Sequence, residues 1–431
     1  MQSPLSNGWF LVVSRLGCLL LTLTLVMLPG IGCKRKQAVK RVKPSPAMAQ
    51  ATDDRPNDSP APGDPGWTSV RTYEIKIAPG DLQSVESGGL GNRTVSAIFQ
   101  GERHEYPGAE IRVRGSWART WPKKALKIVF DKDDRFSGHH AVNLNSGGRD
   151  PSFVREPLAY YVFGRCGVPV PESHMVRLMA NGVFHGLYIE VEQAEKPLLK
   201  RSHLKGAILY KAISVAADER DHGPVSALAG HYERASDKES GMDDLQRFCD
   251  ELQHTRDPAD FFNRRVDVTR YINYLAGCVL LQHWDGFNKN HYVVYDAEGS
   301  HKWFIIPWDL DRTMGDWWDM TFSRYDAPIF LGTQRMPGIT GWNRMEERFL
   351  SVPSFRAQFL QRISQLLDEE FTPEKLNPIL DEFEAAISSD AAADRRLWPS
   401  PAGDLHSGIE GVKRFIVHRR EFLKREIAIA K

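Results

Sequence analysis

The chain has 431 residues, of which 42% are hydrophobic and 26% are charged, and its formal net charge is +1. This length allows one large two-lobed domain or two to three smaller ones, and the composition is that of a soluble globular protein. A charge so close to zero gives no argument for nucleic acid or a strongly acidic surface as partner. We therefore expect no nucleic-acid partner.

The N-terminus has the pattern of an export signal. An apolar run, Leu16–Leu28, is short for a membrane span and suits the core of a signal peptide. Cys33 follows it closely, as in a lipoprotein signal, although Gly30 stands where leucine is usual and Lys34–Lys36 places positive charge after the run. A plain signal peptide and an uncleaved anchor are the alternatives. We expect export, with a lipid-anchored protein on the cell surface or in the periplasm as the main interpretation.

Composition divides the chain into four segments. Residues 1–33 are the predicted signal, and residues 34–67 are rich in Pro, Ala, Asp and Ser without apolar periodicity, which predicts a disordered tether. Residues 68–192 carry strand patterns and form the predicted β-rich N-lobe. Residues 193–431 turn mainly helical and form the predicted α-rich C-lobe, with a hinge expected near Glu192–Lys196.

The N-lobe contains alternating apolar runs bounded by turn residues, which predict β-strands. The predicted strands are Thr72–Ile77, Thr94–Gln100, Glu110–Gly115, Lys124–Phe130, Met175–Met179 and Gly186–Val191, with Ala207–Ala212 just beyond. Ala78–Asp81 reads as a turn, and Asn181–Gly182 is a strong hairpin signal. Asn143–Ser146 is expected to lead into a helix capped by Asp150 or Ser152.

Helical periodicity dominates from Asp243 onward, where Leu245, Phe248 and Leu252 share one face. The strongly apolar stretch Arg270–Gln282 predicts a buried helix. Further helices are predicted near Glu346–Leu350, Ser354–Leu367, Pro373–Ser388 and Gly408–Ile429. Strands first and helices later indicate an α+β fold, and a ligand is then expected at the interface of the two lobes.

Two lysines lie on the predicted strand Lys124–Phe130, after the Gly-containing, Trp-rich connection Gly115–Pro122. Alternate residues of a strand share a face, so Lys127 points away from Leu126 and its apolar neighbours, whereas Lys124 shares their face. A phosphate-binding lysine is thus better placed at Lys127 than at Lys124. The simpler interpretation is a solvent-facing lysine on an edge strand, which is a common position for lysine.

The stretch with the most chemistry begins at Asp285. Asn290 follows five residues later, and a predicted hairpin then delivers Asp309 and Asp311 after the apolar strand Trp303–Ile306. One carboxylate, one carboxamide and a carboxylate pair are what phosphoryl transfer needs to orient an acceptor hydroxyl and hold Mg²⁺. The spacing Asp-x4-Asn followed by a hairpin and a metal Asp is typical of protein kinases.

Two other interpretations of this stretch stay open. Asp285 and Asn290 could serve only to satisfy backbone groups in a loop between a helix and a strand. Asp309, Asp311 and Gly315 could belong to a calcium loop, although the further acidic ligands of such a loop are missing. Cys166, Cys249 and Cys278 are scattered in apolar contexts, so we expect buried thiols rather than a disulfide framework or a zinc site.

Several of these motifs occur together and in order, and the chain resembles the CotH kinase family, the spore coat protein H-like atypical kinases. The resemblance spans about Thr72 to Gly315. Its motifs are Arg112–Gly115, Trp121–Lys124, Leu126–Phe130, Leu144–Asn145, Asp150–Arg155, Asn181–Glu192, Asp285–Tyr295 and Pro307–Gly315. The family is described as kinase-like in fold and as transferring phosphate from ATP to protein hydroxyls.

The resemblance implies a role for each matching residue. Asp285 would be catalytic, and Asp309 would bind the metal with help from Asn290 and Asp311. The nucleotide-binding residues implied on the N-lobe are Lys127 or Lys124, Arg114 and Glu192. The implied cofactors are ATP and Mg²⁺, with Mn²⁺ as an alternative, and the implied partners are the nucleotide, a protein substrate and, through the N-terminal segment, a membrane.

One departure from the family pattern affects the function. Ser116, Trp117 and Ala118 stand where the family has an Asn and two Ser. If those small residues line the phosphates, nucleotide binding could be altered here. The expected function is an exported atypical protein kinase acting on Ser or Thr, and the alternative is a catalytically weak pseudokinase that serves as a surface binding or structural protein.

Overall fold

The structure is a computed structural model that describes residues 69–101, 104–115, 117–236, 240–316, 324–330 and 343–430, apart from the side chain of Trp117. All of them fall in one compact unit, residues 59–431. The predicted signal peptide and tether lie outside the described residues. No helix of the described ranges is long and apolar enough to cross a membrane.

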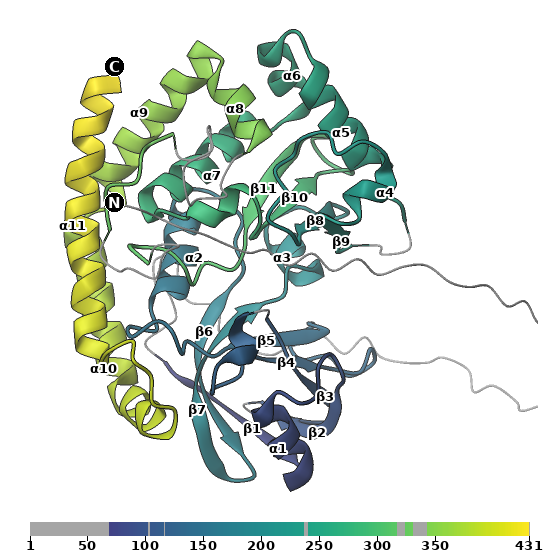
Figure 1. The fold of residues 1–431 in the computed structure, drawn as a ribbon, viewed down its shortest axis with the longest axis vertical. Helices are drawn as coiled ribbons and strands as arrows, with labels where there is room; N and C mark the ends of the chain where they lie inside the picture. Colours follow the sequence, from purple (N-terminus) through teal and green to yellow (C-terminus); the bar gives the residue numbers. More distant parts are fainter. Residues whose placement is uncertain are drawn as a thin grey trace, which may run out of the picture. The chain divides into compact units, whose positions relative to one another are not determined.

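Seven strands of the N-terminal part close into a barrel in the order β1-β2-β3-β4-β5-β7-β6 (Figure 1). Neighbouring strands are antiparallel except β1 and β6, which run parallel and close the barrel. The strands are β1 (Arg71–Ile77), β2 (Val95–Gln100), β3 (Glu105–Val113), β4 (Leu126–Val129), β5 (Ala141–Asn145), β6 (Ser173–Ala180) and β7 (Val183–Glu192).

Alternation along the strands gives the barrel two different faces. The interior is filled by an apolar cluster that includes Ile111, Leu126 and Leu144, with a group of aromatic rings around Phe99. Residues one position away point outward. The register pairs Arg112 with Lys127 and Lys127 with Asn143, so these three polar side chains share the outer face of β3, β4 and β5.

The C-terminal part contains a four-stranded sheet in the order β11-β10-β8-β9 and most of the helices (Figure 1). Its strands are β8 (Ile208–Ala212), β9 (Tyr232–Arg234), β10 (His291–Tyr295) and β11 (Trp303–Pro307). Its helices are α3 (Lys196–Arg201), α4 (Val225–Leu228), α5 (Asp243–His254), α6 (Pro258–Arg265), α7 (Val268–Leu281), α8 (Arg344–Leu350), α9 (Pro353–Glu369), α10 (Pro373–Leu397) and α11 (Leu405–Ala430). The α+β class and the order of strands before helices agree with the prediction.

Helix α10 attaches the barrel to the helical part. The Nζ of Lys123, just before β4, lies 2.5 Å from the Oδ1 of Asp394 on α10, and both side chains are buried. One turn earlier on α10, Asp390 forms an ion pair at 2.6 Å with Arg177 of β6. Breaking a buried pair leaves an uncompensated charge, so Lys123 and Asp394 hold the two parts of the molecule together.

Three local predictions were wrong. Ala78–Asp81 is not an isolated turn, because Pro79 starts helix α1 (Pro79–Ser87), a position where the missing N–H of proline costs nothing. Asn143 lies in β5 rather than on the way to a helix, and its strand pairs with both β4 and β7. Helix α2 (Arg155–Arg165) starts later than expected, with Asp150 accepting a hydrogen bond from the Arg155 amide.

Other predictions were confirmed. Asn181 and Gly182 both have positive φ and form the tight turn between β6 and β7. The apolar stretch Arg270–Gln282 corresponds to helix α7, of which Tyr271–Leu281 is buried. The three cysteines beyond the N-terminal segment, Cys166, Cys249 and Cys278, are free and buried.

Candidate functional site

A hairpin of the second sheet brings the predicted catalytic and metal loops together. Strands β10 and β11 pair from His291 with Pro307 to Tyr295 with Trp303. The amide of Trp308 also donates to the carbonyl of Asn290 at 2.9 Å, which places Asn290 directly beside the start of the Asp309 loop. Four apolar or aromatic residues of β10, Tyr292–Tyr295, and all five residues of β11 are nearly all buried, and their burial fixes this register.

Asp285 lies in a short 3-10 helix (Trp284–Phe287) after α7, and its side chain is almost completely buried. The Nδ2 of Asn290 donates to its Oδ2 at 2.8 Å, and the Nζ of Lys289 lies 3.4 Å from the same oxygen. The other oxygen, Oδ1, accepts no hydrogen bond from the described residues. Asp285 is therefore oriented through one oxygen and leaves the second available.

Carboxylates accumulate around Asp309. Burial and the nearby charge of Asp309 raise the pKa of Glu156 on α2 to about 7. Burial also raises the pKa of Asp285 to about 6, and Asp309 adds to the effect. The pKa of Asp311 is raised well above its usual value by burial and by the charges of Asp309, Glu156, Asp285 and Asp316. Such crowding of like charges favours either protonation or a bound cation.

The backbone is strained at two of these positions. Asn290 has φ +57° and Asp309 has φ +58°, in the left-handed region that costs free energy for a residue with a Cβ. Asn and Asp tolerate this conformation better than most residues. Both of these residues lie where the predicted catalytic loop meets the predicted metal loop, and strained backbone is common at functional sites.

A cationic cluster faces these carboxylates from the barrel and from β8. Burial is the largest cause that lowers the pKa of Lys127 to about 8, and the charges of Arg112, Arg114 and Lys211 contribute to the same shift. The pKa of Lys211 is also lowered, mainly by burial; the charge of Arg114 lowers it as well, whereas the charge of Asp309 raises it. None of these four cations has an ion pair within the described part of the chain. Their mutual repulsion makes the cluster suited to an anion.

Lys127 and Lys124 have different environments. The Nζ of Lys127 donates to the Oε1 of Gln193 at 3.2 Å, in the segment that joins the barrel to α3. The Nζ of Lys124 instead donates to the carbonyls of Arg119 at 2.9 Å and Trp121 at 2.5 Å. Only Lys127 belongs to the cationic cluster, as the alternation of the strand predicts.

Arg114 connects the two charge clusters through a neutral side chain. Its guanidinium donates to the Oδ1 of Asn145 on β5, and the Nδ2 of Asn145 donates to the Oε2 of Glu156 at 2.7 Å. The second oxygen of Glu156, Oε1, is buried and has no hydrogen-bond partner among the described residues. Glu156 is thus held by the barrel through Asn145, and its carboxyl group lies close enough to Asp309 for the two charges to interact.

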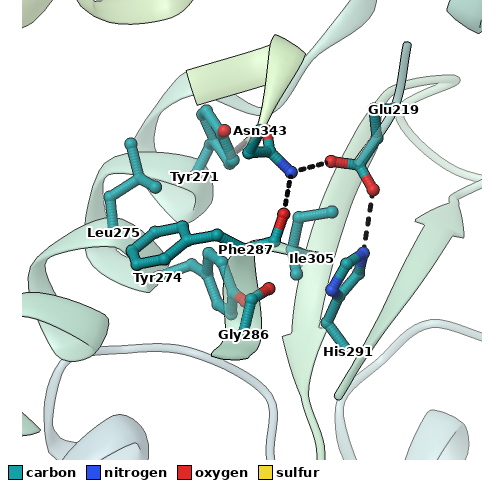
Figure 2. Close-up of a pocket in the computed structure, with 9 residues that line it drawn as sticks. All are labelled: Glu219, Tyr271, Tyr274, Leu275, Gly286, Phe287, His291, Ile305 and Asn343. Carbon is teal, nitrogen blue, oxygen red and sulfur yellow. Dashed lines mark hydrogen bonds and ion pairs between the residues drawn. The ribbon is translucent and has the colours of Figure 1, made fainter. Parts of the chain in front are cut away.

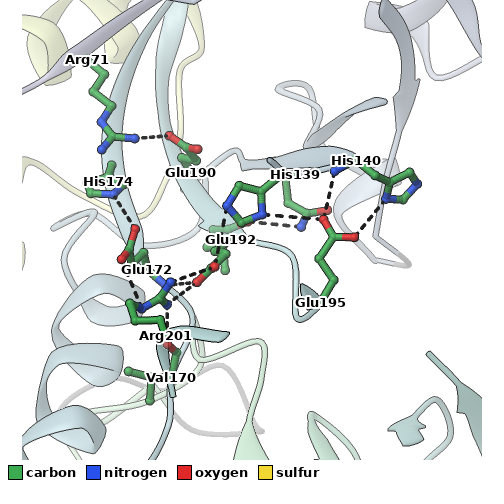
Figure 3. Close-up of polar contacts among 12 residues, drawn as sticks. Arg71, His139, His140, Val170, Glu172, His174, Glu190, Glu192, Glu195 and Arg201 are labelled. Atoms are coloured by element: carbon green, nitrogen blue, oxygen red, sulfur yellow. Dashed lines mark hydrogen bonds and ion pairs between the residues drawn. The ribbon is translucent and has the colours of Figure 1, made fainter. Parts of the chain in front are cut away.

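Glu192 lies elsewhere, in a polar network where β7 leads into α3 (Figure 3). Its Oε2 lies 2.6 Å from Arg201 and accepts from the Glu172 amide at 2.9 Å. His139 approaches Glu192 at 3.7 Å and Glu195 at 3.6 Å. These contacts occupy Glu192 at the predicted hinge, so the structure does not bring it to the cationic cluster.

The carboxylate group fits a divalent cation by its donor chemistry. Glu156 Oε1 and Asp285 Oδ1 are buried oxygens without hydrogen-bond partners among the described residues. The charge of Asp309 acts on Glu156, and the charges of Asp309, Glu156 and Asp285 act on Asp311. Hard oxygen ligands of this kind bind Mg²⁺ or Mn²⁺. The residues that would hold the ion are therefore Asp309 and Asp311, with Glu156, Asn290 and Asp285 beside them.

A second buried network contacts the predicted catalytic loop at Phe287 and at His291 (Figure 2). The Oε1 of Glu219 lies 2.8 Å from the Nε2 of His291, the residue after Asn290. Asn343, at the start of α8, donates to the other Glu219 oxygen and to the carbonyl of Phe287 at 2.9 Å. The space among these residues has no room for a ligand, so the network positions the loop rather than binding a substrate.

Sequence reasoning missed three residues of the site. Glu156 directly follows the quoted motif Asp150–Arg155, and an acidic residue beside it was the available signal. The sequence offers little indication that Lys211 belongs to the site, because it is a single lysine on the short strand β8. Asp316 lies one residue beyond the quoted metal motif and binds Arg149 at 3.0 Å and Arg312 at 3.2 Å.

Comparison with known proteins agrees with this geometry. A family model described as CotH kinase protein matches residues 111–423. The chain is 28% identical over 320 residues to inner spore coat protein H of Bacillus subtilis, covering 72% of this chain and 85% of that protein. Inner spore coat protein H-like protein of the same bacterium is 24% identical over 339 residues, covering 78% and 91%. Invasin CotH2 of Rhizopus delemar is 20% identical over 238 residues, covering 52% and 40%.

The matched region contains every residue of the two charge clusters, and the family model spans well over half of the chain. The resemblance inferred from the motifs is therefore confirmed. This protein belongs to the CotH kinase family.

Proposed function

We propose that this protein is an ATP-dependent protein kinase that transfers the γ-phosphate to Ser or Thr hydroxyls. Family membership supports kinase activity. The observation that carries the proposal is a cationic cluster that faces a carboxylate cluster and is linked to it through Arg114, Asn145 and Glu156. Among the described residues the cations have no ion pairs, and two of the carboxylate oxygens have no hydrogen-bond partner. A nucleotide triphosphate with its metal ion has the charges that complement both clusters.

Each cluster has a separate task in the proposed reaction. Lys127, Arg112, Arg114 and Lys211 bind the phosphate oxygens. Lys127, Arg112 and Lys211 lie on paired strands and Arg114 directly follows β3, so these elements fix the phosphates relative to Asp309. Asp309 and Asp311 hold the metal ion, with Asn290 and Glu156 as additional ligands or supports. A Mg²⁺ ion held there would neutralise the charge that develops on the phosphate groups.

Asp285 orients the acceptor hydroxyl and accepts its proton. Its Oδ2 is held by Asn290 and Lys289, whereas its buried Oδ1 is without a hydrogen-bond partner among the described residues. Burial raises the pKa of Asp285 to about 6, which makes it a better proton acceptor than an ordinary aspartate near neutral pH. In this assignment the barrel and the helical part act as the two lobes of a kinase-like fold, with the hinge at Gln193–Glu195.

The remaining parts of the proposal follow from the sequence. Export, and anchoring of the protein to a membrane through Cys33 or the signal segment, are supported by the apolar run and the cysteine that follows it. We include a protein substrate because the family is a kinase family.

Incubation of the purified protein with labelled ATP and Mg²⁺ or Mn²⁺ tests the function directly. We expect autophosphorylation or phosphorylation of a generic acceptor protein, and none with Asp309→Asn. Metal-dependent ATP binding without any transfer would instead favour the pseudokinase, in which case Ser116–Ala118 would be the first segment to restore to the family pattern. Absence of both ATP binding and transfer would contradict the proposal.

A further inference from the structure

A second cavity lies outside the proposed catalytic site, with a volume of about 380 Å³. It forms where the segment before β4, the loop after β5 and the connection between α10 and α11 meet. Trp121 and Trp398 line it together with Pro399 and Ala402. The volume lies in the range of small-molecule sites, and aromatic and aliphatic walls are typical of them.

The charges around this cavity have one sign. Arg149, Arg395 and Lys123 line it, and its lining contains no acidic side chain within the described part of the chain. Indole faces beside guanidinium groups favour a ligand that has a flat ring and an anionic group. The ring would be held by the aromatic walls and the anion by the arginines.

The walls are already fixed in place by hydrogen bonds. Trp398 donates from Nε1 to the carbonyl of His185 at 2.7 Å, and Ser400 donates to the carbonyl of Gly148 at 2.8 Å. Arg395 donates to the carbonyl of Asp150 at 2.9 Å. A preformed pocket binds without first ordering its walls, which removes one of the costs of association.

Arg395 also carries an unused donor. Its two terminal nitrogens donate to backbone carbonyls, but its Nε is buried without a hydrogen-bond partner among the described residues. A buried donor of this kind costs free energy until an acceptor reaches it. A carboxylate in the cavity is such an acceptor, and burial of the guanidinium strengthens the attraction.

Arg149 connects the cavity with the metal loop. Its Nε and Nη2 lie 3.3 Å and 3.0 Å from the two oxygens of Asp316. Asp316 in turn is one of the charges that act on Asp311. An anion that attracts Arg149 from the cavity would therefore weaken the counter-charge on Asp316 and make the potential at Asp309 and Asp311 more negative.

We propose that this cavity binds a small planar aromatic anion and that its occupancy tightens metal binding at Asp309 and Asp311. The binding part is independent of the kinase function. The coupling part rests on the proposed metal site, and by linkage it must act in both directions. The site differs from the nucleotide site in position and in lining residues.

Indole-3-acetate and its neutral analogue indole-3-acetamide are suitable probes, and calorimetry measures their binding. We expect the acid to bind saturably and at least about tenfold more tightly than the amide, because a hydrogen bond to a charged group is worth roughly 1.5–3 kcal/mol. Ala402→Phe fills the cavity and should abolish binding, whereas Ala392→Phe, at an exposed position of α10, should not. Arg395→Met should remove the preference for the acid.

Equal affinity for both probes, or unchanged binding in Ala402→Phe, would overturn the site. The coupling is tested with Mn²⁺ alone, with and without saturating indole-3-acetate. We expect Mn²⁺ to bind about threefold more tightly with the probe, a shift typical of weak coupling between sites, and no such change in Arg149→Met. Unchanged Mn²⁺ affinity would refute the coupling but not the site, and loss of kinase activity alone would affect neither result.

Discussion

The cationic and the carboxylate clusters are built on different kinds of backbone. Arg112 and Lys127 lie on adjacent strands of a closed barrel, where the register determines which side chains face outward, and Arg114 follows directly after β3. Asp285 and Asp309 stand in loops, and Asp309 has a strained backbone conformation. The barrel side is thus positioned by regular hydrogen bonding, whereas the carboxylate side depends on buried support from elsewhere.

This difference has consequences for how each side fails. A sheet face tolerates the loss of one side chain because the strands stay paired, so the remaining cations keep their places. A strained loop loses its geometry when the contacts that hold it are removed. The loop that carries Asp285 is held by hydrogen bonds among Glu219, His291 and Asn343 and by the bond from Asn343 to the carbonyl of Phe287. Substitutions on the carboxylate side should therefore have larger effects than substitutions on the barrel side.

The largest expected effects separate Asp309 from Asp285. Asp309→Asn removes the central metal carboxylate, and we expect metal-dependent ATP affinity to fall by at least about 100-fold, since even outer-shell changes cost 10–100-fold. Asp285→Asn should leave ATP binding almost normal and reduce turnover by about 10²–10⁴, the usual contribution of a general base. Calorimetry with Mg-ATP and single-turnover transfer assays measure the two quantities.

The pattern of loss decides between the assignments. Equal loss of ATP binding in both variants would mean that the two carboxylates share the metal or have exchanged roles. Unchanged turnover in both would leave Asp285 and Asn290 as ordinary loop residues. Glu156→Gln is a useful companion, because it keeps the hydrogen bond from Asn145 in reach but removes one charge beside Asp309.

The next largest effect is expected on stability, when the ion pairs between the barrel and helix α10 are broken. Asp394→Ala leaves the buried ammonium of Lys123 without its counter-charge, and we expect the free energy of unfolding to fall by about 3–5 kcal/mol. Asp390→Ala, one turn earlier on α10, breaks an ion pair whose arginine is 40% exposed and should cost less than about 1 kcal/mol. Urea unfolding compares them, and equal losses would show that burial of the pair does not matter.

The two lysines of the barrel should differ in what they lose. Lys127→Ala removes a cation from the cluster, and we expect ATP to bind roughly 10-fold to 100-fold more weakly, as for the loss of a charge-assisted hydrogen bond. Lys124→Ala should leave ATP affinity unchanged and lower stability, because its ammonium binds only backbone carbonyls. A titration in which Lys124→Ala has the stronger effect on ATP would reverse the assignment.

The smallest expected effect concerns pH at the hinge. Burial alone would lower the pKa of His139, but Glu195, Glu192 and Glu190 outweigh it and raise the value above 6.5. Burial would raise the pKa of Glu195, but His139 and His140 lower it to about 2. His139 therefore contributes stability at low pH that is lost as pH rises through its raised pKa, and Glu195 contributes stability that is lost only near pH 2.

Unfolding in urea at about pH 6 and about pH 8.5, on either side of the ordinary histidine range, tests this. The wild-type protein should lose more stability over this interval than His139→Gln does. The same slope in both proteins would contradict a charged His139 in the network of Figure 3. Lys127 is also among the groups near Glu195, so ATP affinity should be followed over the same interval.

Prediction from sequence succeeded where a local pattern matched the final environment. The runs Tyr292–Tyr295 and Trp303–Ile306 are apolar and bounded by a polar turn, and they form β10 and β11. Lys127 lies on the face of β4 opposite Leu126, as the alternation predicted, whereas Lys124 lies before β4 and donates to backbone carbonyls. Prediction failed at Asn143, where no strand was predicted because polar residues interrupt the apolar pattern. The strand there, β5, is stabilised by pairing with β4 on one side and β7 on the other.

The sequence by itself determined the family, the α+β class and the strand-before-helix order, and it predicted the residues of the candidate catalytic and metal loops, because each depends on spacing or periodicity within short segments. Only the tertiary structure decided that β1 closes a barrel with β6, that Glu156 joins the carboxylates and that Glu192 is paired with Arg201. Those features depend on contacts between residues far apart in the chain, and no local pattern specifies which distant side chain fills a given position.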